Sequence, residues 1–178
     1  IDFDPGPGTY ILSNTSGDDM FVSKLDVNGD FVWAKQFKTT NPPVASIFGI
    51  ALVSDDLGNI IITGDFNGGV DFDPGPGTFI LTGENFADIY ICKLSVDGNL
   101  IWAKQMAPLD KQNFGTGRSV VIDAAGNIYI YGFFRGTVDL DPGPGVFNLS
   151  TGLNDAIFLS CLNSAGDFLW AREIKGDS

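Results

Sequence analysis

The heptapeptide Asp71-Phe72-Asp73-Pro74-Gly75-Pro76-Gly77 decides how this chain folds. The same Asp-x-Asp-Pro-Gly-Pro-Gly pattern occurs at residues 2–8 and 139–145, at spacings of 69 and 68 positions. Recurrence at a nearly fixed spacing indicates a tandem array of structural units. Proline fixes φ and lacks an N–H, so two successive Pro-Gly pairs interrupt any helix or central strand. We therefore expect each copy to be a fixed loop with two carboxylates at its entrance.

Four apolar segments recur around each loop and are predicted to be strands. The first two are joined by a Gly-Asn turn, which is a hairpin signal between apolar runs. The last two are joined by Asn28-Gly29 or Asp97-Gly98, which predicts type I′ turns with two residues at φ > 0. The segments are 49–55 and 117–123; 60–64 and 128–132; Met20–Leu25, Ile89–Leu94 and Ile157–Leu162; and 31–35, 100–104 and 168–172. A short apolar segment after each loop is expected to form an accessory strand: Thr9–Leu12, Thr78–Leu81 and Val146–Leu149.

Several predicted strands are apolar on consecutive positions, such as Ile60-Ile61-Ile62 and Val120-Val121-Ile122. A strand with one wet face would alternate, so this pattern predicts burial on both faces. The predicted fold class is all-β, with tandem four-stranded antiparallel meanders of the β-propeller type. We expect a partial blade at 1–38, consisting of the loop and the last two strands, and complete blades at 39–106 and 107–178.

These two and a half units are too few for a closed propeller, which usually has four to eight blades. Further blades of the same chain, or other copies, are therefore expected to close the fold. An open stack of units is the alternative. Residue 1 falls inside a repeat, which favours a segment of a longer chain.

Composition narrows the classes of partner. The 178 residues include 10 Lys and Arg against 22 Asp and Glu, a net charge of −12, which argues against nucleic acid and anionic membranes. The sequence has no His, the commonest general base. No apolar run reaches the ~20 residues of a membrane span, and no signal peptide is recognisable. Cys92 and Cys161 are expected to be free thiols in apolar strands, on opposite faces.

The candidate metal ligands are the paired carboxylates of the repeated loop. Two Asp at i and i+2 can face one hard cation such as Ca²⁺. However, no bidentate Glu follows at a fixed distance, and Asp side chains also cap their own turns. The structural interpretation is therefore favoured, and Ca²⁺ remains the alternative. The six residues are Asp2, Asp4, Asp71, Asp73, Asp139 and Asp141.

Other repeated residues favour packing over chemistry. Trp33, Trp102 and Trp170 recur at the loop spacing and are expected between units, although a sugar-stacking surface is the alternative. Lys35, Lys104 and Arg172 follow them as strand-face cations, expected to pair with Asp. Asp55 and Asp123 precede the Gly-Asn turns and are expected to form them. No nucleophile–base pair can be assembled, and no anion-binding helix follows the Pro-Gly runs.

The repeat also resembles a known family. Gly126-Asn127-Ile128-Tyr129-Ile130, Phe21-Val22-Ser23-Lys24-Leu25 and the Trp-Ala-Lys segment are similar to the bacterial SBBP-type β-propeller repeat, over nearly the whole chain. Relative to Asp88-Ile89-Tyr90, the stretch Asp155-Ala156-Ile157-Phe158 departs by one extra residue, which predicts a register change.

The resemblance implies a secreted or cell-surface protein, often a cargo of type IX secretion, with no fixed catalytic activity. The expected function is a non-enzymatic binding or adhesion scaffold with an unidentified protein or glycan partner. A carbohydrate-active propeller enzyme is one alternative, although its acid and base would be unique to one blade. A stacked structural filament, stabilised by calcium, is the other.

Overall fold

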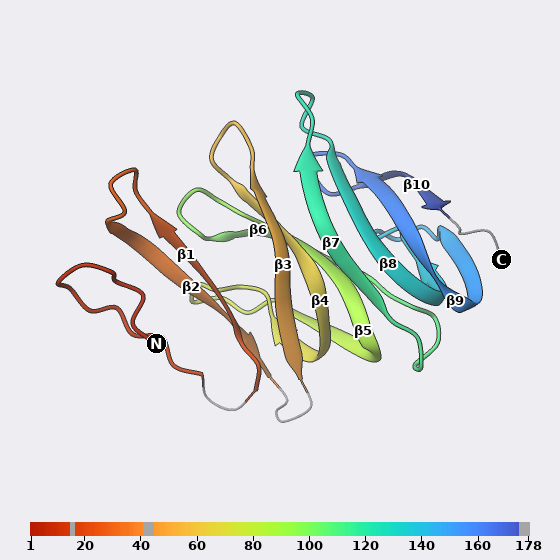
Figure 1. Ribbon diagram of the computed structural model, residues 1–178, viewed down its shortest axis with the longest axis horizontal. Coiled ribbons are helices and arrows are strands. Elements are labelled where there is room, and N and C mark those ends of the chain that lie inside the picture. The colour runs from red at the N-terminus through yellow and green to blue at the C-terminus, as the bar shows by residue number, and fades with distance from the viewer. Residues whose placement is uncertain (15–16, 41–44, 175–178) are drawn as a thin grey trace.

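The computed structural model describes residues 1–14, 17–40 and 45–174, and within those ranges it contains strands, turns and irregular segments but no helix. The β1–β2 hairpin, the β3–β6 strands and the β7–β10 strands follow one another across the molecule, with β1 and β10 toward opposite ends (Figure 1). In the described residues they are β1 (Met20–Leu25), β2 (Phe31–Thr39), β3 (Ser46–Ser54), β4 (Ile60–Asp71), β5 (Ile80–Leu94), β6 (Leu100–Met106), β7 (Gly115–Ile122), β8 (Ile128–Asp139), β9 (Asn148–Leu162) and β10 (Phe168–Ile174).

The pairing produces antiparallel meanders. β3, β4, β5 and β6 pair in that order, and β7 to β10 repeat the arrangement. β1 and β2 form a hairpin that joins the first meander through two residue pairs, Lys38 with Asp71 and Thr39 with Val70. The all-β fold class is thus confirmed. The unit boundaries at 38/39 and 106/107 stay a prediction, and residues 41–44 and 175–178 of the predicted blades lie outside the described residues.

The accessory strand is not a separate element in the two meanders. Residues 80–81 and 148–149 are the first paired residues of the long strands β5 and β9, which continue to Leu94 and Leu162. A bulge lets each long strand bend and keep its partner, and Gly68 (φ 66°) or Gly136 (φ 78°) lies at the bulge on the facing strand. In the first unit this pairing is reduced to one bridge, between Asp2 and Ile11.

The register change expected at Asp155–Phe158, within β9, is absent. Phe66 pairs with Asp88 and Phe134 pairs with Ala156, so the two meanders keep one register and Ala156 occupies the position of Asp88. Asp88 is buried and accepts a 2.6 Å hydrogen bond from Gln105, and the residue at the Gln105 position in the next unit is Glu173. A carboxylate opposite Glu173 would repel it.

The turns also differ from the predicted type I′. The structure describes no non-glycine residue at positive φ, whereas Gly29 and Gly98 have φ of 85° and 74°. The N–H of Gly29 donates to the carbonyl of Asp26, and the Asp26 N–H donates to Asp30, which makes a longer loop with one left-handed glycine. The Asp26 carboxylate accepts two N–H groups of this loop, so only the glycine needs φ > 0.

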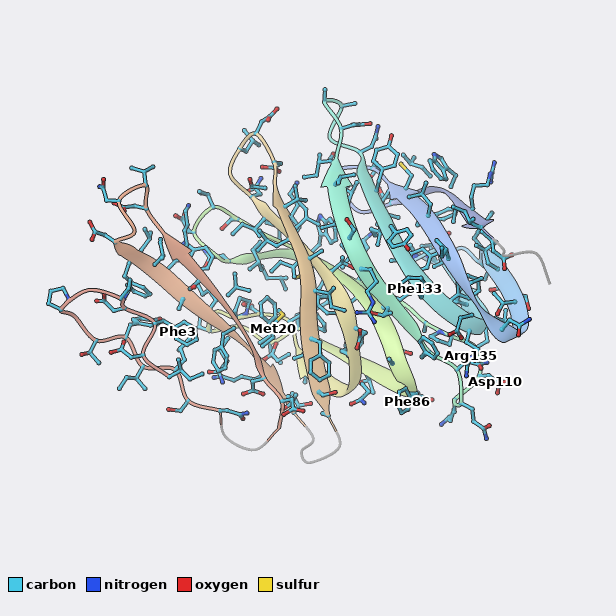
Figure 2. All side chains as sticks on the ribbon, viewed as in Figure 1. Phe3, Met20, Phe86, Asp110, Phe133 and Arg135 are labelled. Carbon is cyan, nitrogen blue, oxygen red and sulfur yellow. The ribbon has the colours of Figure 1, made fainter. Side chains whose placement is uncertain are left out.

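The hydrophobic core lies between consecutive units. One cluster joins Met20 and Phe37 of the first hairpin to the inner face of β4 and β5, and Met20 lies between β1 and β3 in Figure 2. The other joins Ile61, Ile91 and Met106 to β7, β8 and β9. Strand β7 packs across β3, β4 and β5. The expected face-to-face packing is therefore confirmed, and it explains the consecutive apolar positions of the central strands.

Candidate functional site

Each Asp-x-Asp-Pro-Gly-Pro-Gly loop is held by its own carboxylates. Asp71 Oδ1 accepts the N–H of Asp73 at 3.0 Å and that of Phe79 at 2.8 Å, which closes the two ends of the loop. Asp73 Oδ1 accepts the N–H of Gly75 at 2.8 Å. The equivalent bonds hold the other two loops: from Asp4, Tyr10 and Gly6 to Asp2 and Asp4, and from Asp141, Phe147 and Gly143 to Asp139 and Asp141.

The glycines of the loop are required by close approach to the aspartate. A Cβ on Gly77 would lie well under 3.0 Å from Asp73 Oδ2, and one on Gly75 would lie 2.9 Å from Oδ1. Gly8 and Gly145 stand in the same relation to Asp4 and Asp141. None of these glycines has a positive φ, so their role is space and not conformational freedom. The motif is therefore a single steric and hydrogen-bonded unit.

The loops place two carboxylates together but give them backbone partners. The two N–H bonds to Asp2 lower its carboxyl pKa, as expected for an anion that accepts amide donors. Within the described residues, no three Asp, Glu or Cys side chains converge as metal ligands would. Calcium at these six residues stays a prediction.

A second acidic cluster lines a cavity of about 580 Å³ between the β3–β4 and β7–β8 turns. Asp55 forms its turn as expected, because Oδ1 accepts the N–H groups of Leu57 and Asn59. Its Oδ2 lies 2.9 Å from the ammonium of Lys93, and the side chains are 15% and 11% exposed. Burial alone would raise the pKa of Asp55, but the bonds from Asn59 and Lys93 outweigh it and lower that pKa to about 2.

The next unit lacks the cation. Cys161 occupies the position of Lys93, and Asp123 Oδ2 instead accepts a 3.0 Å bond from the hydroxyl of Tyr129. The hydrogen bonds from Asn127 lower the pKa of Asp123. The hydrogen bond that Tyr129 donates to Asp123 raises the pKa of Tyr129. Asp123 also forms its turn as expected. The cavity is thus lined by three carboxylates and one ammonium: Asp55, Asp56, Asp123 and Lys93.

Trp33 and Trp102 each pack over a turn of the following unit, an arrangement that we call a clasp. Trp33 Nε1 donates to the carbonyl of Val96 at 3.2 Å, and Lys24 donates to the same oxygen. A Cβ on Gly98 would lie 2.8 Å from Lys35 Cε and 3.3 Å from Trp33. A Cβ on Gly166 would lie 3.1 Å from Trp102 Cζ2 and 3.0 Å from Lys104 Cε, but in the described residues the indole N–H of Trp102 has no hydrogen-bond partner. The expected position between units is confirmed for Trp33 and Trp102, which are partly buried against the two cores.

The strand-face cations have different partners. Lys104 lies 3.2 Å from Asp167 of the turn that it covers, as expected. For Lys35 the structure gives packing against Gly98.

Both cysteines are free and buried, as expected, and burial raises the pKa of each thiol. Thiols in this state are poor nucleophiles. Burial raises the pKa of Asp65, and its Oδ1 accepts the hydroxyl of Thr116 across the interface of the two meanders.

The sequence analysis did not predict three arrangements that the structure shows. They are the Asp55–Lys93 ion pair, the packing of tryptophans on turn glycines, and the hydrogen bonds between buried Asp and Gln side chains. Gln36 donates to Asp19 at 2.7 Å, as Gln105 does to Asp88. The clearest available signal was that Gln36 and Gln105 recur two positions after a repeated Ala, where a strand residue on a buried face should be apolar.

No protein-family model matches the chain. The chain is similar to an uncharacterized WD repeat-containing protein of Acanthamoeba polyphaga mimivirus, with 26% identity over 177 residues. The similarity covers 93% of this chain and 12% of the viral protein. Together with the antiparallel meanders, it fits a propeller-like fold whose sheets do not close within the chain. The described residues contain no long apolar helix that could span a membrane.

Proposed function

We propose that this chain is a non-enzymatic β-propeller repeat segment that serves as a binding or adhesion scaffold in a secreted or cell-surface bacterial protein. The observation that carries the proposal is how the repeated polar residues are used. The aspartates of the repeated loops accept backbone N–H groups. Trp33 and Trp102 cover the turns at Gly98 and Gly166 of the following units. Residues used in this way give the same structural support in each described unit.

The extracellular part of the proposal is supported by the resemblance to the SBBP-type repeat. The strongly acidic surface favours a protein, glycan or cationic partner over a nucleic acid. The partner would bind where the units differ, because the shared residues are occupied by the fold. One such difference is at Tyr131 and Phe133 of β8, which replace Thr63 and Asp65 of β4.

A carbohydrate-active enzyme is the alternative from another class. A glycosidase needs two carboxyl groups, one with a raised pKa, on either side of a sugar. Burial raises the pKa of Asp65, but its carboxylate accepts the hydroxyl of Thr116 between the packed sheets. This placement supports a structural role for Asp65.

The test has two arms. Protease treatment of intact cells that carry the tagged full-length protein should remove the tag, and loss only after lysis would refute the surface location. The purified chain should retain defined glycans or surface proteins on an array without releasing reducing ends from polysaccharides. Release that disappears in Asp65→Asn, with an unchanged melting temperature, would establish the enzyme instead.

A further inference from the structure

A second cavity, of about 470 Å³, lies where β7 begins, at the opposite end of this strand from the acidic cavity. The connector before β7 contributes Asp110, Gln112 and Asn113 to its lining. The paired strands β8 and β9 contribute Thr137 and Ser150 together with two glycines. Figure 2 labels Asp110 at this end of the molecule. The cavity is therefore formed by one meander and the connector that leads into it.

Every side chain in the lining of this cavity is polar. Among the described residues, the side chains of Asp110, Gln112 and Asn113 form no hydrogen bond or ion pair with the protein. Thr137 Oγ1 lies 2.9 Å from Ser150 Oγ, and a hydroxyl can make more than one hydrogen bond. The cavity therefore presents a carboxylate, two amides and a hydroxyl to whatever enters it.

These groups lie where the two meanders differ. Asn113 lies against the glycine at the bulge of β8, and Ala45 holds the same position beside the bulge glycine of β4. Gly152 occupies the position of Glu84, which removes a long side chain from the rim. The cavity is thus built by residues that the repeat does not require for its own packing.

The rim of this cavity is a part of the repeat that a following unit leaves open. In the preceding meander the equivalent rim has the next unit beside it, because Lys111 of that unit lies 3.4 Å from Glu84. The Glu84 side chain is nevertheless 70% exposed. Thr82, which occupies the position of Ser150, is exposed as well. Access to the cavity therefore does not require that the next unit be absent.

The chemistry of the lining selects the kind of ligand. A cavity of this volume lies within the range of about 300–1,000 Å³ that is typical of small-molecule sites. An apolar ligand would cover the polar side chains without giving them hydrogen bonds, which is costly. The carboxylate of Asp110 and the net charge of −12 disfavour an anion. A neutral ligand rich in hydroxyl groups can bond to the carboxylate as a donor and to the amides as an acceptor.

We propose that this cavity binds an uncharged saccharide. Asp110 accepts hydrogen bonds from sugar hydroxyls, the amides of Gln112 and Asn113 donate to sugar oxygens, and Thr137 contributes its hydroxyl. This inference rests on the proposed function as a binding scaffold, and it names the partner class and the place where that partner binds.

The first experiment screens the full-length protein for saccharide binding by saturation-transfer NMR. The neutral probes are the pentasaccharides of cellulose, xylan, starch, mannan and chitin, and the acidic probes are oligogalacturonate and sialyllactose. At least one neutral probe should bind, and the acidic probes should not. Failure of every neutral probe to bind, or preferential binding of the acidic probes, overturns the inference.

The second experiment locates the site by titrating the neutral probe that binds best. Asp110→Ala removes a charged hydrogen-bond acceptor and should weaken binding at least about tenfold. Gln112→Ala removes a neutral partner and should weaken it about three- to tenfold. Asp97→Ala and Asn99→Ala are the matched controls, because these exposed polar residues belong to a turn outside the cavity.

Asp110 and Gln112 are exposed, so both variants should keep the native melting temperature. Binding that neither variant weakens, or that the controls weaken equally, overturns the saccharide site. The two proposals fail separately. A surface protein that captures only a protein partner keeps the scaffold function and refutes the saccharide site. Saccharide binding that depends on Asp110, in a protein that protease cannot reach on intact cells, keeps the site and refutes the surface location.

Discussion

The geometry of the repeated loop predicts that Gly77→Ala destabilises the chain when Asp73 is present and stabilises it when Asp73 is replaced by alanine. In the native chain, Gly77→Ala places a methyl group against Asp73 Oδ2 and displaces the carboxylate from the N–H of Gly75. Losing a hydrogen bond to a partly exposed charged group costs about 1.5–2 kcal/mol. Replacing glycine by alanine at a compatible φ restores about 0.5 kcal/mol through the unfolded state. The net change should be a destabilisation of about 1 kcal/mol.

In the Asp73→Ala background the carboxylate is already gone, so the new methyl group meets no oxygen. Gly77→Ala should then stabilise the fold by about 0.5 kcal/mol, because Gly77 does not have a positive φ. The coupling between the two positions is therefore about 1.5 kcal/mol. Residues in contact through one hydrogen-bonded unit commonly show coupling of this size.

The assay is urea denaturation of the four chains of this cycle, with the slope m checked for constancy. The same cycle at Gly145 and Asp141 provides an internal replicate, because the distances there match those of the second loop. Equal effects of Gly77→Ala in both backgrounds would show that the aspartate does not hold the loop and would refute the reasoning.

Three further outcomes are expected. Asp55 has a folded pKa of about 2 against an ordinary 3.8. It therefore contributes about 2 kcal/mol to the free energy of unfolding above pH 4, and this contribution is lost as the pH falls to 2. Lys93→Met should reduce the fall in melting temperature between pH 4 and pH 2. Cys92 and Cys161 should resist iodoacetamide at pH 8 until the chain unfolds, and rapid labelling of the native chain would contradict their burial. EDTA and Ca²⁺ should leave the melting temperature unchanged. Asp73→Asn should lower the unfolding free energy less than Asp73→Ala, because an amide oxygen still accepts the Gly75 N–H. A calcium-dependent rise in melting temperature that Asp73→Asn abolishes would establish the metal site.

The sequence predicted those features that depend on local periodicity. The spacing of Asp4, Asp73 and Asp141 placed the loops, and the apolar runs located the strands and the buried faces. Turn type was mispredicted, because Asn-Gly favours type I′ only in a two-residue loop, and here Asp26 caps a longer one. Asp26 precedes Gly29 by three positions, as Asp55 precedes Gly58, so the capping residue was present in the sequence but was not applied to this turn.

Contacts between distant residues were beyond the reach of pattern alone. Asp55 and Lys93 belong to a turn and to a strand two elements away, so their pairing depends on the register of β4 with β5. The clasp of Trp33 on Gly98 depends on how two sheets stack. The role of the loop glycines also depends on such a contact, because the carboxylate of Asp73 occupies the space that a side chain on Gly77 would need.

The acidity of the chain follows in large part from how its turns are built. Nine of the 22 acidic residues accept an N–H of their own loop or turn, and each is an aspartate. Such bonds favour the ionised form and lower the pKa of Asp26 and Asp123, so the charge is fixed by the fold at neutral pH. Each of the three units contains three of these aspartates, so the array gains negative charge with every unit. The net charge of −12 is then a consequence of β-turn construction, and it needs no acidic ligand-binding function to explain it. The nine residues are Asp2, Asp4, Asp26, Asp55, Asp71, Asp73, Asp123, Asp139 and Asp141.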